Sequence, residues 1–246
     1  MKTLLTLAIL CATAFANAQT AKEIIQKADE LTRGKSSKAD ITIQINRPRW
    51  SREIRMKSWS LGTSYAMTYI MEPAKEKGTV MLKIDKEVWN WLPTIERSVK
   101  LPPSMMMQSW MGTDFTNDDL VKQSSILVDY NHAIVGDSLI LGRKCTKIEL
   151  IPKEGAPVVW GKIFIWVDTK DYLQLKSEMY DEDGYLINVM SAKKIGEFGG
   201  KTFVTETEMM PMEKPGNTTV LIYNDLEFDI EIEKDFFTTQ NMRRIR

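Results

Sequence analysis

The sequence has very few of the residues that most often carry chemistry. Only two of its 246 residues are cysteine and only one is histidine. Cys145 lies in the alternating run KCTKIEL, which is typical of a small buried hydrophobe rather than a reactive thiol. His132 has no second ligand at metal-binding spacing, so no metal site is predicted. A lone histidine near a strand end is usually a satisfied or exposed side chain.

Sequence signatures of catalysis and nucleotide binding are also missing. There is no nucleophile elbow, no phosphate-cradling loop and no dinucleotide fingerprint, and the run GEFGG at 196–200 indicates a hairpin turn. We therefore predict that the protein is not an enzyme and that it needs no cofactor.

The clustered acidic residues have a structural interpretation. Asp181–Asp183 precede Gly184, which is the composition of a turn. Asp114, Asp118 and Asp119 surround the start of a short predicted helix, where acids cap exposed N–H groups. Catalysis or calcium binding is the alternative for the second group.

The sequence has no excess of one sign of charge and no second long apolar run. The chain has 33 basic and 33 acidic residues, which argues against general nucleic-acid binding because that needs a basic field. After the N-terminus no segment reaches eighteen uninterrupted apolar residues, so no membrane span is predicted.

The N-terminus has the organisation of a secretory signal peptide. Lys2 is followed by the apolar run Leu4–Phe15 and by the small-x-small site Ala16–Ala18. We expect cleavage after residue 18, which leaves residues 19–246 as a single domain.

This cleavage also bears on redox chemistry and location. Cys11 is preceded by Leu10, where a lipid-attachment site needs a small residue, so we expect Cys11 to be discarded with the signal peptide. Cys145 is then the one remaining cysteine, and no intramolecular disulfide can form. An exported protein without disulfides suits the periplasm, with the mature chain soluble there.

The periodicity of the mature chain predicts a mainly β (α+β) fold. A capping box formed by Thr20 and Glu23 begins one amphipathic helix, which Gly34 ends. Alternating segments then predict strands at 37–46, 50–61, 65–71, 79–85, 87–92, 126–135, 144–151, 158–167, 173–180, 185–194, 201–210 and 218–228. Short turns force antiparallel neighbours, so we expect a single curved antiparallel sheet of about eleven or twelve strands, covered by a few helices, with room for a ligand between them.

Apolar side chains are concentrated in two places. Trp89 and Trp91 share one face of a predicted strand, and four methionines and Trp110 lie within Met105–Met111. Ordinary packing of a helix on a sheet is one interpretation. A surface that repacks around ligands of variable shape is the other, because unbranched methionine adapts its shape.

The motifs around these residues resemble those of the outer-membrane lipoprotein-sorting family, the LolA-like periplasmic carriers. The similar blocks are Trp91-Leu92-Pro93 with Arg97, and Ser109–Leu120, SWMGTDFTNDDL. Later segments such as SEMYDEDGYLINV are similar too, so the resemblance covers essentially the whole mature chain. It implies an incomplete antiparallel β-barrel closed by helices around an apolar cavity for acyl chains.

The resemblance also implies a function. We expect a periplasmic carrier that binds the acyl chains of lipoproteins or lipids and shuttles them towards the outer membrane. The expected lipid-binding residues are Met105, Met106, Met107, Trp110, Met111, Trp89, Trp91 and Phe115.

Its expected partners are lipid or lipoprotein acyl chains, an inner-membrane exporter and an outer-membrane acceptor, with no nucleic acid. The expected state is a monomer with only transient membrane contact. Two alternatives stay open: a non-carrier envelope protein whose apolar surface docks a membrane export complex, and a hydrolase, which the lack of a histidine-based constellation disfavours.

Overall fold

The computed structural model describes residues 19–121, 125–156 and 158–245. The predicted signal peptide, residues 1–18, lies outside the described residues. None of the helices in the described ranges is long and apolar enough to cross a membrane.

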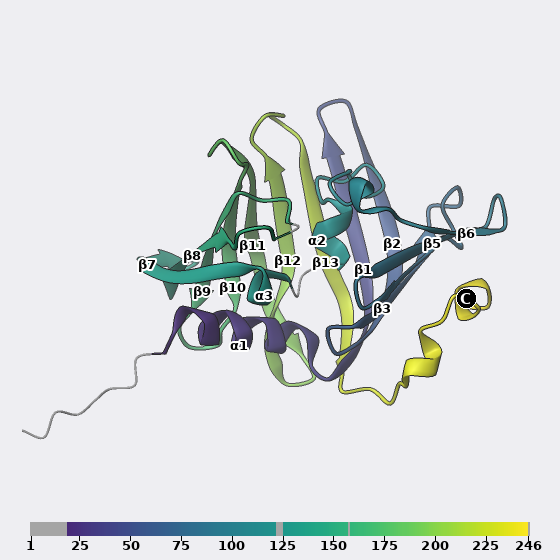
Figure 1. Ribbon diagram of the computed structural model, residues 1–246, viewed down its shortest axis with the longest axis horizontal. Coiled ribbons are helices and arrows are strands. Elements are labelled where there is room, and N and C mark those ends of the chain that lie inside the picture. The colour runs from purple at the N-terminus through teal and green to yellow at the C-terminus, as the bar shows by residue number, and fades with distance from the viewer. Residues whose placement is uncertain (1–18, 122–124, 157, 246) are drawn as a thin grey trace, which may run out of the picture.

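One antiparallel sheet of thirteen strands forms the body of the molecule (Figure 1). Its strands are β1 (Ser36–Arg47), β2 (Trp50–Leu61), β3 (Tyr65–Glu72), β4 (Val80–Ile84), β5 (Glu87–Leu92), β6 (Arg97–Lys100), β7 (Tyr130–Ile140), β8 (Arg143–Pro152), β9 (Lys162–Asp168), β10 (Gln174–Tyr180), β11 (Leu186–Phe198), β12 (Lys201–Pro211) and β13 (Thr218–Phe228). Strands that follow each other in sequence pair within β1–β6 and within β7–β13, and the pairing of β1 with β13 joins these two halves. Because β6 and β7 are the two edges, the curved sheet does not close into a barrel.

The predicted fold class is confirmed, although individual strands differ from the prediction; β9, for example, begins at Lys162 and not at residue 158. The four-residue strand β6 was not predicted, because it shows no clear alternation. A strand was also predicted to begin at Ile126, whereas Ser125–Val128 form the helix α3 and β7 begins at Tyr130. The capping box of the first helix is present as predicted, and α1 spans Ala21–Arg33.

The concave face of the sheet is apolar and covered. Ile41, Ile43 and Ile45 alternate inward along β1 and are at most 6% exposed. The helix α1 covers the half formed by the later strands, and a lid segment, residues 101–121, covers the half formed by the early ones. The lid segment contains the 3-10 turn η1 (Pro103–Met105) and the short helix α2 (Asn117–Val121).

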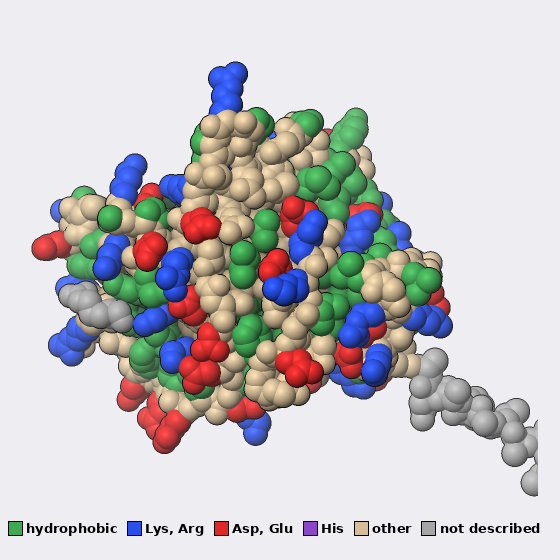
Figure 2. Space-filling model, turned by 180° about the vertical axis from the view of Figure 1, so that it is seen from behind, with side chains coloured by type: hydrophobic (Ala, Val, Ile, Leu, Met, Phe, Trp, Pro, Cys, Tyr) green, Lys and Arg blue, Asp and Glu red, His purple; other side chains and the backbone are tan. Residues whose placement is uncertain are grey.

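The outer face of the sheet has two regions. Over β2–β5 it is apolar and is covered by a C-terminal strap, residues 229–245, which contains the 3-10 turns η2 (Lys234–Phe236) and η3 (Asn241–Arg243). Over the other strands it carries cross-strand ion pairs such as Lys193–Glu208, and on β9 the rings of Phe164 and Trp166, whose centres lie 4.0 and 4.7 Å from the ammonium of Lys147. Figure 2 shows the molecule from behind, where side chains of both charges are intermixed over this face.

Candidate functional site

A cavity of about 350 Å³ lies between the concave face, α1 and the lid segment. Its lining is mainly apolar. The apolar wall includes Ile25, Ala28, Ile41, Met56, Trp110, Phe115, Leu120, Ile126, Ile163, Ile165, Met179, Met190, Met209 and Leu221. The volume falls in the range of pockets that hold small ligands, roughly 300–1,000 Å³.

The lid segment is not a regular helix over its methionines. After η1 the chain folds back on the start of α2: the Asn117 side chain donates to the carbonyl of Met105 at 2.9 Å, and the backbone N–H of Trp110 donates to the carbonyl of Phe115 at 2.8 Å. Met111 and Gly112 both have positive φ angles at the tight turn. The segment is therefore a compact loop held by its own hydrogen bonds.

A buried ion pair attaches the lid segment to the sheet. Arg47, at the end of β1, donates to both carboxylate oxygens of Asp114, at 3.0 and 3.1 Å, and to the carbonyl of Gly112 at 3.0 Å. Thr219 on β13 donates to Asp114 as well, at 2.7 Å. The side chains of Arg47 and Asp114 are 11% and 6% exposed. The interpretation of Asp114 as a helix cap is therefore wrong, because this carboxylate points away from α2 to the arginine.

The cap interpretation is correct for Asp119. Its carboxylate accepts the N–H of Thr116 at 2.8 Å, and its own N–H donates to the Thr116 hydroxyl at 3.0 Å. The indole of Trp160 donates to the other oxygen at 3.3 Å. Burial raises the pKa of the Asp119 carboxyl, and these hydrogen bonds partly oppose the shift. Asp119 thus joins the lid segment to the wall of the cavity.

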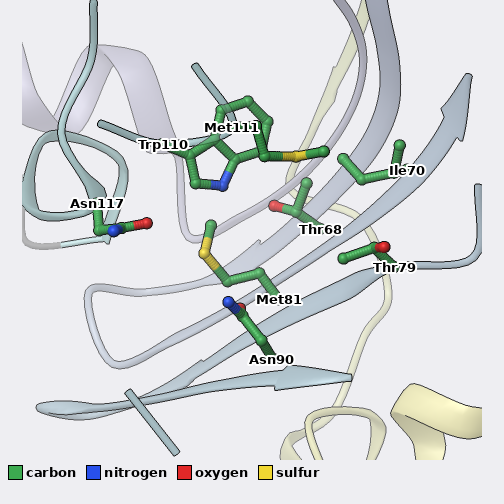
Figure 3. A pocket seen from close by; sticks show the side chains of 8 residues that line it. All are labelled: Thr68, Ile70, Thr79, Met81, Asn90, Trp110, Met111 and Asn117. Carbon is green, nitrogen blue, oxygen red and sulfur yellow. The ribbon is translucent and has the colours of Figure 1, made fainter. Parts of the chain in front are cut away.

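A second arginine, Arg52 of β2, also holds the lid segment. Its guanidinium donates to the carbonyl of Met111 and forms an ion pair with Glu76 at 3.2 Å. Beneath this contact is a small pocket of about 100 Å³ that shares Thr68, Met81 and Trp110 with the main cavity. Figure 3 shows Trp110 and Met111 on one side of this pocket and the side chains of the sheet on the other.

The main cavity also has a charged end. Arg33, in the last turn of α1, lines the cavity and forms a two-point ion pair with Asp29. Near Arg33, but not itself lining the cavity, Lys83 on β4 is only 6% exposed, and its ammonium donates to the carbonyl of Thr63 at 2.8 Å. Burial, together with the positive charge of Arg33, lowers the pKa of Lys83 to about 8.

The predicted lipid-binding residues lie in several different places. Trp110 and Phe115 line the main cavity, and Met111 lines the small pocket. Met106 is buried in the core under the lid segment, whereas Met105 and Met107 are exposed on its outside, at 37% and 65%.

The other two predicted residues lie on the opposite face of the sheet. Val88 and Asn90 of β5 point to the concave side, so Trp89 and Trp91 point outward. There they pack under the C-terminal strap, where the guanidinium of Arg243 lies 5.2 Å from the ring centre of Trp91.

The charged residues of the site were not predicted from the sequence. Arg33 and Asp29 fit the polar side of a helix, and Lys83 interrupts a strand as surface lysines do, so only the spatial arrangement singles them out. The one signal was Lys83 itself, since it occupies the same strand face as Met81.

The remaining chemically active side chains have structural roles. His132 is hydrogen-bonded to the carbonyl of Ile126 at 2.7 Å, and Cys145 is fully buried in an apolar cluster with Trp166. Cys145 was predicted to be a buried hydrophobe, and His132 was predicted to be a satisfied or exposed side chain. Among the described residues no group of three or more His, Cys, Asp or Glu side chains is placed to hold a metal ion.

Several solved structures have the same fold. A DUF1329 family protein from Desulfovibrio piger aligns with a TM-score of 0.83 and 20% identity, over 90% of this chain and 97% of that one. A putative outer membrane lipoprotein-sorting protein domain from Vibrio parahaemolyticus gives 0.81 and 22%, over 91% and 98%. A LolA superfamily protein from Nitrosomonas europaea gives 0.77 and 23%, over 91% and 99%.

Sequence comparison adds the family. None of the curated proteins compared with the chain matches it. A protein-family model with the description "Uncharacterized protein" matches residues 62–244, which is well over half of the chain. The protein therefore belongs to that family, and its fold is that of the LolA-like, outer-membrane lipoprotein-sorting proteins.

Proposed function

We propose that the protein is a periplasmic carrier that binds the acyl chains of lipoproteins or lipids and shuttles them towards the outer membrane. The observation that carries this proposal is the apolar cavity of about 350 Å³ under a separate lid segment. The likeness of the fold to lipoprotein-sorting proteins supports it.

The energetics of an acyl chain explain why such a cavity is needed. Each buried methylene contributes about 0.8 kcal/mol, so a sixteen-carbon chain in water costs on the order of 12 kcal/mol relative to a buried one. A carrier must therefore enclose the chain completely and still release it. The lid segment suits both requirements, because its underside is apolar and its attachment to the sheet is polar and local.

The second candidate is a non-carrier envelope protein that docks a membrane export complex. Exposed apolar side chains at one end of the sheet favour it: Trp50, Tyr185 and Met212, which are 53%, 69% and 44% exposed, lie at the β1–β2, β10–β11 and β12–β13 turns. Figure 1 places these turns at the same end of the molecule as the lid segment. In a carrier the same end would contact the exporter and the acceptor during transfer. A docking protein has no need of an open cavity, so the cavity favours the carrier.

The test is the lipid content of the protein purified gently from its native compartment. Native mass spectrometry should find a lipid bound to the folded protein, and added fatty acid should displace a neutral fluorescent dye from the cavity. Repeated absence of lipid, together with no displacement of the dye, would overturn the proposal. A stable protein partner with an empty cavity would favour the docking alternative.

A further inference from the structure

One end of the cavity wall is made of hydroxyl groups. Ser37 of β1 and Ser60 of β2 line the cavity with their side-chain oxygens 2.7 Å apart. Ser58 of β2 and Thr68 of β3 form a second such pair at 3.4 Å. In each pair one hydroxyl donates to the other, and the second hydroxyl keeps a proton that it can donate to a ligand.

Arg33 lies at this same end. The helix α1 ends at Arg33 and β1 begins at Ser36, so the chain connection itself brings the guanidinium to the serine-rich ends of β1 and β2. Asp29 takes the Nε–H and one Nη2–H of Arg33. A guanidinium has five N–H donors, so three are left that Asp29 does not use, on a side chain that faces the cavity.

Lys83 adds a second cation beside Arg33. It follows Met81, which lines the cavity, by two residues on the same face of β4. Its ammonium is buried, and the proximity of Arg33 is unfavourable to its charge, as the lowered pKa of about 8 indicates. An anion bound at Arg33 would stabilise the charged form of Lys83, because opposite charges stabilise each other strongly in a poorly solvated site.

The opposite end of the cavity is more apolar, although Ser177 of β10, Tyr130 of β7 and Asp119 of the lid segment also line the cavity there. Ile163 and Ile165 of β9, Met179 of β10 and Phe115 of the lid segment form an apolar wall there. The cavity therefore offers an anion a guanidinium and hydroxyl donors at the Arg33 end and an acidic residue, Asp119, at the other. A cavity for hydrocarbon alone needs no buried guanidinium or row of hydroxyls.

We propose that the cavity binds an amphiphile with an acidic headgroup, a carboxylate or a phosphate ester, whose anion is held by Arg33 and the hydroxyls of Ser37, Ser58, Ser60 and Thr68. The acyl chain extends from there to the wall formed by β9 and β10. This inference rests on the proposed function and names the chemistry of the cargo.

The test compares ligands that share one chain and differ in the headgroup. Palmitate, hexadecyl phosphate and hexadecanol compete, below their micelle concentrations, with N-phenyl-1-naphthylamine, a neutral dye that carries no anion of its own. We expect one or both acidic ligands to bind the wild-type protein at least about tenfold more tightly than hexadecanol, since hydrogen bonds to charged groups are about twice as strong as neutral ones. Their ranking separates carboxylate from phosphate cargo, and acetate and inorganic phosphate should not displace the dye.

Variants then assign the preference to Arg33. In Asp29→Asn with Arg33→Gln the pair is removed together, so no unpaired buried charge remains, and the preference for acidic ligands should fall to about twofold or less. The matched control is Asp40→Asn with Arg55→Gln, an Asp–Arg pair on the outer face with oxygen and nitrogen 3.4 Å apart, which should keep the full preference.

The outcomes separate this inference from the proposed function. If hexadecanol binds the wild-type protein as tightly as both acids, or if the variant at Arg33 keeps the preference, the headgroup site is wrong and the carrier proposal survives. If none of the three ligands displaces the dye, the carrier proposal itself fails. The wild-type comparison needs no variant, so it decides the matter even if the double variant does not fold.

Discussion

Replacing Arg47 by methionine should open the lid segment without unfolding the sheet. Methionine keeps the apolar stem of the arginine and removes the guanidinium that donates to Asp114 and to the carbonyl of Gly112. Asp114 would then keep the Thr219 hydroxyl as a partner while its side chain stays only 6% exposed.

The magnitude follows from the burial of the pair. Removing one partner of a buried ion pair typically costs about 3–5 kcal/mol, because the other charge is left unpaired in a poorly solvated place. Asp114 regains water most directly if the lid segment detaches, so we expect the cost to fall on lid closure. A loss of about 3 kcal/mol raises the population of the open lid more than a hundredfold.

The assay measures opening and unfolding separately. The dissociation rate of a bound neutral dye, followed by stopped-flow fluorescence, should rise by about a hundredfold in Arg47→Met, and the amide protons of Gly112–Phe115 should exchange faster. In Arg47→Met with Asp114→Asn much of the loss should be recovered, since the unpaired charge is gone. Arg55→Met is the control, because the exposed Arg55–Asp40 pair contributes at most about 1 kcal/mol.

One result would refute this reasoning. If Arg47→Met lowers the urea midpoint of global unfolding while the dye leaves at the wild-type rate, the ion pair stabilises the sheet and does not hold the lid. Equal losses in the single and double variants would likewise mean that the unpaired carboxylate is not the cause.

Three further predictions address the rest of the structure. Burial lowers the pKa of Lys83 from 10.5 to about 8, so the unfolded chain binds this proton more tightly than the folded protein does. The unfolding free energy of the wild type, relative to that of Lys83→Met, should therefore rise by up to about 3 kcal/mol between pH 8 and 10.5. Urea unfolding measures this difference, and a constant difference across the range would contradict the prediction. Phe237→Ala should cost about 3–5 kcal/mol of unfolding free energy, because this ring of the strap is 2% exposed against the outer face of the sheet. Dye affinity should stay unchanged, and a loss of affinity in the folded variant would place the strap in the site. Trp110→Ala should weaken dye binding, measured by titration, and lower the free energy of unfolding in urea by about 3–5 kcal/mol. Met107→Asp should lower the free energy of unfolding by less than about 0.5 kcal/mol, and a larger loss would mean that this side chain packs inside.

The sheet was predictable because its signals are local. Alternation along each strand and turn residues between strands determine neighbours and direction, and a chain of short turns allows only an antiparallel meander. The pairing of β1 with β13 joins distant segments and left no such local signal. The missed strand β6 has four residues, two of them exposed lysine and arginine, which is too short a pattern to separate from a loop.

The site was predictable only in part because apolar side chains are packed on both faces of β3–β5. Inward residues such as Val88 and outward residues such as Trp89 are both packed, one under the lid segment and the other under the strap. Hydrophobicity alone then cannot assign a strand face to the inside. Asn90 illustrates the difficulty, since this polar residue points into the small pocket while the tryptophans beside it point outward.

The lid segment and the C-terminal strap show what decides between a movable cover and a fixed one. Both are irregular, contain aromatic residues and cover an apolar face of the same strands. The strap inserts Phe237 and Met242 directly into the outer face, at 2% and 1% exposure, so lifting it would expose a packed core. The lid segment also buries Met106 and Trp110, at 6% and 5% exposure, but the rest of its underside covers a cavity and has fewer close contacts to lose. Its polar attachments are the contacts of Arg47 and Arg52 and the hydrogen bond between Trp160 and Asp119. A cover over a cavity costs less to open than a cover over a packed face, because few dispersion contacts are lost and a ligand can replace them. Two segments of similar apolar composition therefore behave differently: the C-terminal strap is a fixed cover on the outer face, and the lid segment is a movable cover on the concave face.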